Sequence, residues 1–557
     1  MNESFSRKIA SFLGFSLTTA SLIAEPSVFF TDFSYQGFDL SEKDQLVSNS
    51  QYLNPIIRGY YPDPSICRVG EDYYLVNSTF THFPSIPVWH SKDLVNWKQL
   101  GFAVDRPENA NFNGMQTSQG MYAPAISYYD GLFYVICTNV GGYGNFYVTA
   151  ENPSGPWSDP VALPFINGID PSFFFDDDGS VYIVHNGEAP DRKPLYNGHR
   201  AIWMWKYDLQ KNKPIGGPTL LVNGGVDLSK KPIWIEGPHL FKKGNFYYLI
   251  CAEGGTAWEH SEVVFRAKSL TDSFVPYSKN PILTQRDQDR SCPNSITSTG
   301  HADFVETPEG NWWSVFLGCR PYDHNYIHTG RETFLLPVTW TTDDWPVVLP
   351  QGDPLPVINE VPYPKEGARF VTTNFVDSFD STKLAYDWTF LRTPPDAWYS
   401  LELRPGSFAV DPLKESLSSK QNTSFIGYRQ KDKSFKSSVT LDLPKEAGVS
   451  AGLALYQNET ANLFCGIRLG KDGLYHIFVE KTSKGPVENI YEVPLDQGAS
   501  GNITISVSGD ESVHTFSYSL NGNVYTELPE IDGHFLSTHE AGGFVGVVMG
   551  PYAREDQ

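Results

Sequence analysis

The segment Asp63-Pro64-Ser65-Ile66, followed by the aromatic pair Tyr73-Tyr74, carries the pattern that decides the fold. An acidic residue opens an apolar run, a polar or glycine-bearing turn follows, and an aromatic strand comes next. The pattern returns twice with an acid at the same place, as Asp170-Pro171-Ser172-Phe173 with Val181-Tyr182 and as Glu236-Gly237-Pro238-His239 with Tyr247-Tyr248. From the acid to the second aromatic residue the spacing is 11, 12 and 12 residues.

Two further copies lack the acid. They begin at Ala123-Pro124-Ala125 and His301-Ala302-Asp303, and they continue to Phe133-Tyr134 and Trp312-Trp313. Five units about 50–65 residues apart indicate radial repetition, and each has room for about four short strands, which is one propeller blade. Because equivalent positions in a radial array face one axis, we expect the three acids to meet at one mouth of the central channel.

The chain as a whole is predicted to be all-β with two domains. Its 557 residues exceed one ordinary core, and its aromatic residues, 14% of the total, lie mostly in short alternating runs. The sequence predicts a five-bladed β-propeller over 54–350, a stiff proline-rich linker over 351–370, and a β-sandwich of concanavalin-like type over 371–557, where period-2 strands alternate with polar turns.

The N-terminal region is predicted to be an export signal followed by a lead-in. Residues 1–24 have a basic start, Arg7-Lys8, and then a mostly apolar stretch, which predicts a signal peptide and a secreted or periplasmic protein. Residues 25–53 are expected to form a polar, irregular lead-in. No other segment is long and apolar enough to span a membrane.

The net charge narrows the choice of partner. A formal charge of −22 disfavours nucleic acid, an anionic membrane surface and a polyanionic substrate. A neutral ligand fits this negative charge better than any of these three partners. The sequence does not indicate an oligomeric state.

The three acids predict hydrolysis of a sugar bond. One carboxyl group can act as a general acid on the leaving oxygen and another as a general base on water. A third negative group nearby raises the pKa of the acid and keeps it protonated near neutral pH. A single Asp-Pro-Ser would more simply be a turn at a strand start. Three acids at the start of three repeats favour a catalytic role instead.

At this point the sequence resembles glycoside hydrolase family 43, the five-bladed propeller glycosidases. The resemblance covers about 54–350, and the residues that carry it are Asn54-Pro55, Tyr61-Pro62-Asp63-Pro64-Ser65, Gly168-Ile169-Asp170-Pro171-Ser172, Glu236-Gly237-Pro238-His239-Leu240, Ala252-Glu253-Gly254-Gly255-Thr256, Gly300-His301-Ala302-Asp303 and Gly330-Arg331-Glu332-Thr333-Phe334. The second domain resembles the C-terminal sandwich of the β-xylosidase-like members through Gly427-Tyr428-Arg429-Gln430 and Gly542-Gly543-Phe544-Val545-Gly546.

The resemblance implies a role for each acid. Asp63 would be the general base, Glu236 the general acid, and Asp170 the residue that tunes the pKa of Glu236, in a reaction that inverts the anomeric centre without a catalytic cofactor. Arg331 would reach the substrate from the fifth blade. His301 would lie on the propeller axis, where family members often hold a calcium ion or a water network.

The chain departs from the family pattern in its second unit. The family commonly has Trp-Ala-Pro-Asp there, whereas this chain has Tyr122-Ala123-Pro124-Ala125, so the aromatic residue remains and the acid is lost. Phe83, Tyr122 and Trp258 are candidates for stacking on a sugar ring, and core packing between blades is the alternative for each of them.

The function predicted is exo-acting, inverting release of terminal α-L-arabinofuranose, β-D-xylose or both from plant hemicellulose fragments. One alternative is a strict β-D-xylosidase acting on xylo-oligosaccharides. A retaining fructosyl hydrolase is disfavoured, since its Asp-Pro-Asn and Arg-Asp-Pro motifs are absent around Asp63 and Asp170. A non-catalytic sugar-binding protein is disfavoured by the intact trio.

Overall fold

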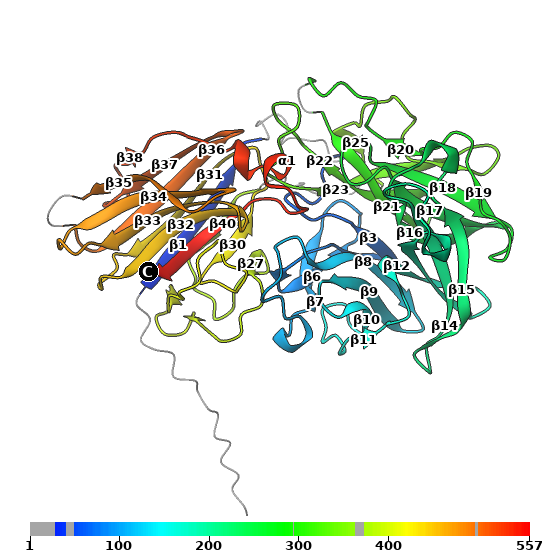
Figure 1. Cartoon of the computed structure of the whole chain (residues 1–557), viewed down its shortest axis with the longest axis horizontal. Helices are drawn as coiled ribbons and strands as arrows, with labels where there is room; N and C mark the ends of the chain where they lie inside the picture. The colour runs from blue at the N-terminus through cyan, green and yellow to red at the C-terminus, as the bar shows by residue number, and fades with distance from the viewer. Residues whose placement is uncertain (1–27, 40–49, 293–294, 363–372, 496–498, 557) are drawn as a thin grey trace, which may run out of the picture.

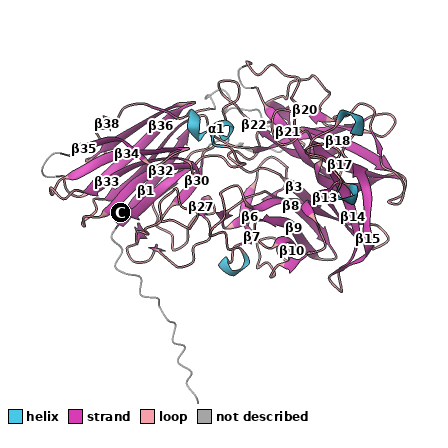
Figure 2. Cartoon of the chain, viewed as in Figure 1, coloured by secondary structure: helices cyan, strands magenta, loops and turns pink. Residues whose placement is uncertain are grey.

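The structure, a computed structural model, describes residues 28–39, 50–292, 295–362, 373–495 and 499–556. The expected signal peptide over 1–24 lies outside these residues. Within them, strands dominate, and a propeller and a sandwich lie side by side (Figures 1 and 2). The helical elements of the described ranges are η1 (Pro107–Asn109), η2 (Pro190–Arg192), η3 (Leu228–Lys230), η4 (His534–Leu536) and α1 (Thr538–Ala541). In the part of the chain that is described, no helix has the length and apolar character that crossing a membrane requires.

Five antiparallel sheets form the blades of the propeller. The first is β3 (Ser65–Val69), β4 (Asp72–Val76), β6 (Ser85–Ser91) and β7 (Lys98–Val104), and the second is β8 (Gly120–Tyr129), β9 (Leu132–Val140), β10 (Gly144–Ala150) and β11 (Val161–Ala162). The third is β12 (Gly168–Phe175), β13 (Val181–Glu188), β14 (Arg200–Asp208) and β15 (Lys213–Asn223). The fourth is β16 (Glu236–Lys243), β17 (Phe246–Glu253), β18 (Ser261–Ala267) and β19 (Val275–Pro276), with β20 (Leu283–Thr284) paired to β18. The fifth is β21 (Thr297–Glu306), β22 (Trp312–Cys319), β23 (Glu332–Trp340) and β24 (Pro346–Val347).

The blades close into a ring. The first strands of successive blades, β3, β8, β12, β16 and β21, contact one another in turn, and β21 contacts β3. The chain before the first blade fastens this closure, because Asn54 Nδ2 donates to the Leu335 carbonyl of β23 at 2.8 Å and Asn54 Oδ1 accepts from the Leu335 N–H at 2.9 Å. In addition, β2 (Gln51–Leu53) pairs with β25 (Ile358–Glu360), which lies within the predicted linker.

The backbone is distorted at one equivalent position of each blade. Asp63, Ala123, Asp170, Gly237 and His301 all have positive φ, between 35° and 55°. The register of β8, β12, β16 and β21 shifts at this position, and such bulges redirect side chains. A non-glycine residue held at positive φ costs on the order of 1–3 kcal/mol, so the surrounding fold must impose it.

This distortion shows which residue of each blade occupies the equivalent position, and it corrects the alignment of the three acids. The position in the fourth blade that matches Asp63 and Asp170 is Gly237, since the prolines that follow these three residues are Pro64, Pro171 and Pro238. Glu236 therefore precedes the equivalent position by one residue. The prediction that all three acids occupy the same place in their repeats is wrong for Glu236, because the repeat was aligned on charge and not on backbone geometry.

Two antiparallel sheets form the sandwich. One has the order β28 (Tyr399–Ser400), β29 (Phe408–Val410), β1 (Val28–Gly37), β31 (Ser434–Asp442), β36 (Asn502–Asp510), β37 (Val513–Ser519) and β38 (Thr526–Glu527), with β26 (Phe375–Asp377) and β39 (Ile531–Asp532) at its sides. The other has the order β35 (Glu488–Pro494), β34 (Tyr475–Ser483), β33 (Ala461–Leu469), β32 (Val449–Asn458), β40 (Val548–Glu555), β30 (Ile426–Arg429), β27 (Trp388–Leu391) and β5 (His82–Phe83). The predicted order of propeller and sandwich is confirmed.

Strand β1 corrects the expectation of an irregular lead-in, because it runs through the middle of a sandwich sheet. Val28, Phe30, Phe33 and Tyr35 are buried in the sandwich core. A register shift between Phe30 and Asp32 breaks the alternation of apolar and polar residues. That break explains why the sequence pattern does not predict a strand. Within the described residues, the chain passes through the sandwich at β1 before it forms the propeller.

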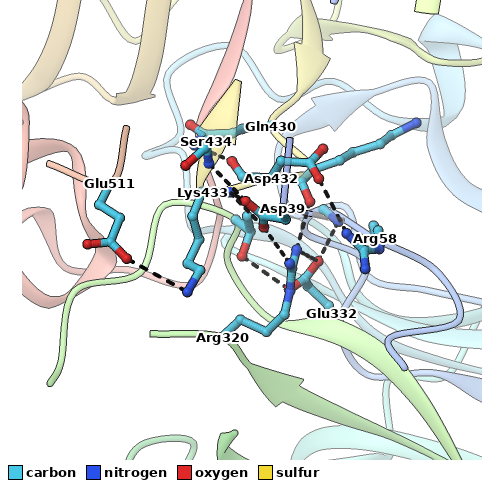
Figure 3. A network of polar contacts seen from close by, with 12 residues as sticks. Asp39, Arg58, Arg320, Glu332, Gln430, Asp432, Lys433, Ser434 and Glu511 are labelled. Atoms are coloured by element: carbon cyan, nitrogen blue, oxygen red, sulfur yellow. Dashed lines mark hydrogen bonds and ion pairs between the residues drawn. The ribbon is translucent and has the colours of Figure 1, made fainter. Parts of the chain in front are cut away.

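A buried polar network joins the two domains (Figure 3). The Arg320 guanidinium donates to both carboxylate oxygens of Glu332, at 2.6 and 2.9 Å, and to Asp39 at 2.7 Å. Arg58 pairs with Asp432 of the sandwich at 3.3 Å. Removing one partner of a buried ion pair costs about 3–5 kcal/mol, so this network holds the sandwich firmly against the fifth blade.

Candidate active site

A cavity of about 510 Å³ opens where the first strands of the blades begin. Asp63, Asp170 and Glu236 all line it, although they lie in three different blades. Arg331 of the fifth blade and Phe544 of the sandwich complete its wall. The structure thus brings together the three acids that the sequence singled out, with one residue of the second domain beside them.

Asp63 is held as a carboxylate. Ser78 Oγ donates to its Oδ2 at 2.5 Å, and Arg331 Nη1 donates to its Oδ1 at 3.0 Å. Burial alone would raise the pKa of Asp63, but the Arg331 charge and the Ser78 hydrogen bond outweigh burial and hold this pKa below its ordinary value. An ionised carboxylate in this position can accept a proton from water.

The surroundings of Glu236 favour its protonated form. Burial, followed by the negative charges of Asp170 and Asp63, raises the pKa of Glu236 well above its ordinary value. Burial and the charge of Asp63 also raise the pKa of Asp170, to about 7. The Gly237 N–H donates to Asp170 Oδ2 at 3.1 Å, which ties Asp170 to the backbone beside Glu236. A negative charge on Asp170 therefore acts directly on the neighbouring acid.

These opposite pKa shifts fit the expected roles of base and acid. A pair of carboxyl groups whose pKa values are pushed apart can perform general base and general acid chemistry at one pH. The ionised Asp63 can activate water, and the protonated Glu236 can donate to a leaving oxygen. The arrangement fits hydrolysis of a glycosidic bond held between the two.

The aromatic wall of the cavity comes from three segments. Tyr122, a predicted contact, lines the cavity, and its ring lies edge-on to Phe80 at 5.2 Å between centroids. Phe544 stacks on Phe80 at 5.9 Å, and the Arg331 guanidinium lies 5.4 Å from the centre of the Phe544 ring. This apolar wall surrounds the charged groups and excludes water from one side of the site.

The lining residues that the sequence analysis did not predict include Phe80, Arg200, Trp234 and Phe544. In the sequence, the segment Gly542-Gly543-Phe544 indicates the second domain and carries no sign of a place in the cavity. Its backbone is placed by the Phe544 N–H, which donates to Ser118 Oγ at 2.9 Å. No local pattern marks Arg200 or Trp234, because their part in the site depends on how the third and fourth blades meet.

Two predicted aromatic contacts lie elsewhere. Phe83 belongs to β5, where it pairs with Phe390 of the sandwich, and it is only 5% exposed. The expectation that Phe83 touches substrate is therefore corrected: its ring fills the junction between the domains, and Phe80, three residues earlier, lines the site. Trp258 lines an adjoining cavity of about 470 Å³. The Arg290 guanidinium lies 3.7 Å from its ring centre and covers one face of it.

His301 lines the catalytic cavity beside Asp63. Its Nδ1 is 3.8 Å from Asp63 Oδ1, and burial lowers its pKa to about 4, which leaves the ring neutral. Among the described residues, no group of three or more His, Cys, Asp or Glu side chains could hold a metal ion. Calcium takes six to eight oxygen ligands, and within the described ranges the acidic side chains near His301 do not form such a group.

Fold and site together define a propeller glycosidase with a carboxylate base and a buried carboxylic acid. Two family models match the chain: glycosyl hydrolases family 43 over residues 52–346, and the beta-xylosidase C-terminal concanavalin A-like domain over residues 376–557. The chain belongs to glycosyl hydrolases family 43.

Relatives with names and solved structures support this assignment. The chain is 38% identical over 517 residues to the non-reducing end alpha-L-arabinofuranosidase BoGH43B of Bacteroides ovatus, covering 91% of this chain and 92% of that protein. It is 38% identical over 506 residues to a xylosidase/arabinosidase of Butyrivibrio fibrisolvens, covering 90% and 95%. A GH43_12 crystal structure from a capybara gut metagenome superposes with a TM-score of 0.89 at 38% identity, covering 95% of this chain and all of that one.

Proposed function

We propose that this enzyme removes single terminal pentose units from hemicellulose oligo- or polysaccharides. The observation that carries the proposal is the pair of carboxyl groups with opposite pKa shifts in a cavity walled by Phe80, Tyr122 and Phe544. Aromatic walls near the acids favour one terminal ring over an internal one. Early products should consist of monosaccharide alone, and a spread of long oligomers from linear xylan would contradict exo attack.

The reaction is proposed to invert the anomeric centre. In this mechanism Asp63 activates the water while Glu236 protonates the leaving oxygen, and the two carboxyl groups must be roughly 6.5–9.5 Å apart to admit the water. Proton NMR of the first product tests the assignment. Product of the opposite anomeric configuration supports Asp63 as base, whereas retained configuration would make Asp63 a nucleophile.

Between the two pentoses, α-L-arabinofuranose is proposed as the preferred unit. Tyr122, which lines the cavity, stands where the family commonly has Trp, and this exchange loosens the contacts around the ring. Ala125, which stands where the family commonly has an acid, is buried in the core beside Phe173. The names of the two relatives, an arabinofuranosidase and a xylosidase/arabinosidase, agree with activity on either sugar. Parallel assays on nitrophenyl α-L-arabinofuranoside and nitrophenyl β-D-xyloside decide the order, and a large excess of xyloside turnover would favour the strict β-D-xylosidase.

Three accompanying proposals concern the need for a cofactor, a bound calcium ion and secretion. Carboxyl groups supply both proton transfers, so no catalytic cofactor is needed. A calcium ion held through water near His301 would change thermal stability on dialysis against EDTA, measured as Tm. Secretion through residues 1–24 predicts that the exported protein begins after this segment, which N-terminal sequencing of the exported form would show.

A further inference from the structure

A second aromatic cavity, of about 270 Å³, lies at the seam between the second and third blades. Its lining includes Trp203 and Trp205 of β14, whose side chains share one face of the strand because they are two residues apart. Both rings are only partly buried. Phe165, from the connection between the blades, packs edge-on against Trp205 at 5.1 Å and forms another wall.

Trp203 is fixed before any ligand arrives. Its Nε1–H donates to the Glu188 carbonyl at 2.9 Å. The indole lies directly against Gly187, where an added Cβ would come within 2.6 Å of Trp203 Cδ1. A ring that is already held in place loses little conformational entropy when a ligand stacks on it.

Polar groups surround these rings. The exposed Asn167 side chain donates to Glu188 Oε2 at 2.8 Å, and Arg192 pairs with the same carboxylate at 3.2 Å. His185 also lines the cavity, and its Nδ1 lies 2.7 Å from the Asn186 carbonyl, whereas its Nε2 has no hydrogen-bond partner among the described residues. Aromatic faces with amide, carboxylate and imidazole groups at their edges suit a neutral sugar, which has apolar ring faces and hydroxyl edges.

A cross-strand residue pair links the seam cavity to the catalytic cavity. Arg200 lines the catalytic cavity, and its cross-strand partner, Glu188, lines the seam cavity. Arg200 is held by Asn186, which accepts from its Nε at 3.1 Å and its Nη2 at 2.7 Å, and Asn186 lies next to His185 in β13. Trp234, which also lines the catalytic cavity, lies 4.9 Å from the Arg200 guanidinium.

The cavity that contains Trp258 is the alternative site for the leaving chain. It shares Thr256, Arg331 and Phe544 with the catalytic cavity, and Arg331 pairs with Asp63. The seam cavity is linked to the catalytic cavity through the Glu188–Arg200 strand pair of the third blade, the blade that carries Asp170. In an inverting reaction the leaving group departs from the face opposite the base, so the two cavities predict different paths for the leaving chain.

We propose that the seam cavity is a distal carbohydrate subsite that binds a sugar unit of the polysaccharide from which the terminal pentose is removed. Trp203 would provide the stacking platform, and Asn167 would bind hydroxyl groups at its rim. The proposal rests on the proposed function, since it concerns the part of the substrate that lies beyond the scissile bond.

The test compares a large substrate with a small one. For Trp203→Ala, the ratio of kcat/KM on arabinoxylan to kcat/KM on nitrophenyl α-L-arabinofuranoside should fall roughly fivefold to tenfold, mainly through a higher KM on the polymer. Asn167→Ala, at an exposed position, should lower the ratio about threefold. Trp203→Phe should restore most of the ratio. The matched control is Tyr525→Ala, which removes an exposed ring from the sandwich far from both cavities along the chain and should leave the ratio unchanged.

Two results would overturn the proposal. One is an unchanged ratio in Trp203→Ala, or in Asn167→Ala if the tryptophan variant does not fold. The other is a fall in the ratio for Trp258→Ala but not for Trp203→Ala, which would place the leaving polysaccharide chain in the cavity that contains Trp258. Failure of the proposed function is distinct from both, because wild-type enzyme would then release no pentose from either substrate.

Discussion

The two sides of the catalytic cavity are made of similar residues and behave in opposite ways. On the base side, burial of Asp63 is outweighed by Arg331 and Ser78, so its pKa falls. On the acid side, burial of Glu236 is reinforced by Asp170 and Asp63, so its pKa rises. Burial is common to both, and the groups around each carboxyl separate them. The comparison shows that a direct arginine contact and a hydrogen bond favour ionised Asp63, whereas two neighbouring carboxylates favour protonated Glu236.

The largest effect should come from removing the base. Asp63→Ala leaves no group to activate water, so kcat should fall by roughly 10³–10⁴ on every substrate. Steady-state rates on a nitrophenyl pentoside and on an oligosaccharide measure this, with the circular dichroism spectrum as a check of folding. A loss confined to the oligosaccharide would show that Asp63 does not act on water.

Removing the acid should produce a loss that depends on the leaving group. In Glu236→Ala, sugar leaving groups need protonation and should lose about 10³ in kcat, whereas nitrophenol leaves readily and should lose about tenfold. A series of aryl glycosides with leaving groups of increasing pKa measures the slope. Equal losses across the series would remove Glu236 from the role of acid.

Arg331 is the charge that separates the two sides. Arg331→Met removes the hydrogen bond to Asp63 and should lower kcat/KM about 10²-fold. Because the Arg331 charge lowers the pKa values of both Asp63 and Glu236, both limbs of the pH–rate profile should move to higher pH. Arg331→Lys retains a positive charge and is the control. A profile that does not move would mean that Arg331 binds substrate without setting either pKa.

Asp170 should affect the acid side alone. Its negative charge raises the pKa of Glu236, and activity requires protonated Glu236, so the rate falls as pH rises through that pKa. Asp170→Asn removes the charge, lowers the pKa of Glu236 and should move the basic limb to lower pH, with a loss of maximal rate of roughly tenfold to a hundredfold. The pH dependence of kcat/KM measures this. A basic limb that stays in place would limit Asp170 to a structural role at its strand start.

The smallest effect should come from the wall that the sandwich contributes. Phe544→Ala opens one side of the cavity and lets water reach both carboxyl groups, which should reduce kcat/KM about tenfold. The acidic and basic limbs should also move closer together as solvent screens the charges. Phe544→Leu, which keeps an apolar wall, should be milder. Equal effects of the two substitutions would show that a specific aromatic contact matters more than exclusion of water.

The sequence was sufficient for the features that repeat or that depend on residue type. The five aromatic strand pairs predicted the propeller, and the alternating strands after 371 predicted the sandwich. The acids Asp63, Asp170 and Glu236 stood out because each opens a repeat, and Arg331 and Tyr122 followed from the family resemblance. All of these features lie within short stretches, so neighbouring residues are enough to detect them.

Other features depend on contacts between distant segments. β1 joins a sheet whose other strands begin more than 300 residues later, and its bulge hides the period of its buried side chains. Phe83 lies in a motif beside the first blade, yet it pairs with the sandwich. Phe544 reaches the cavity from near the end of the chain. Local pattern carries no information about which distant segment will cover a residue.

The sequence by itself determined the fold class, the number of blades and the identity of the three acids. Only the tertiary structure decided that Glu236 precedes the position equivalent to Asp63 and Asp170, because the backbone distortion at Gly237 sets the phase of the fourth blade. It also decided the protonation of each acid, since a pKa depends on burial and on charges brought near by folding. Composition and spacing fix which groups are present, and the distances between them arise only when the ring of blades closes.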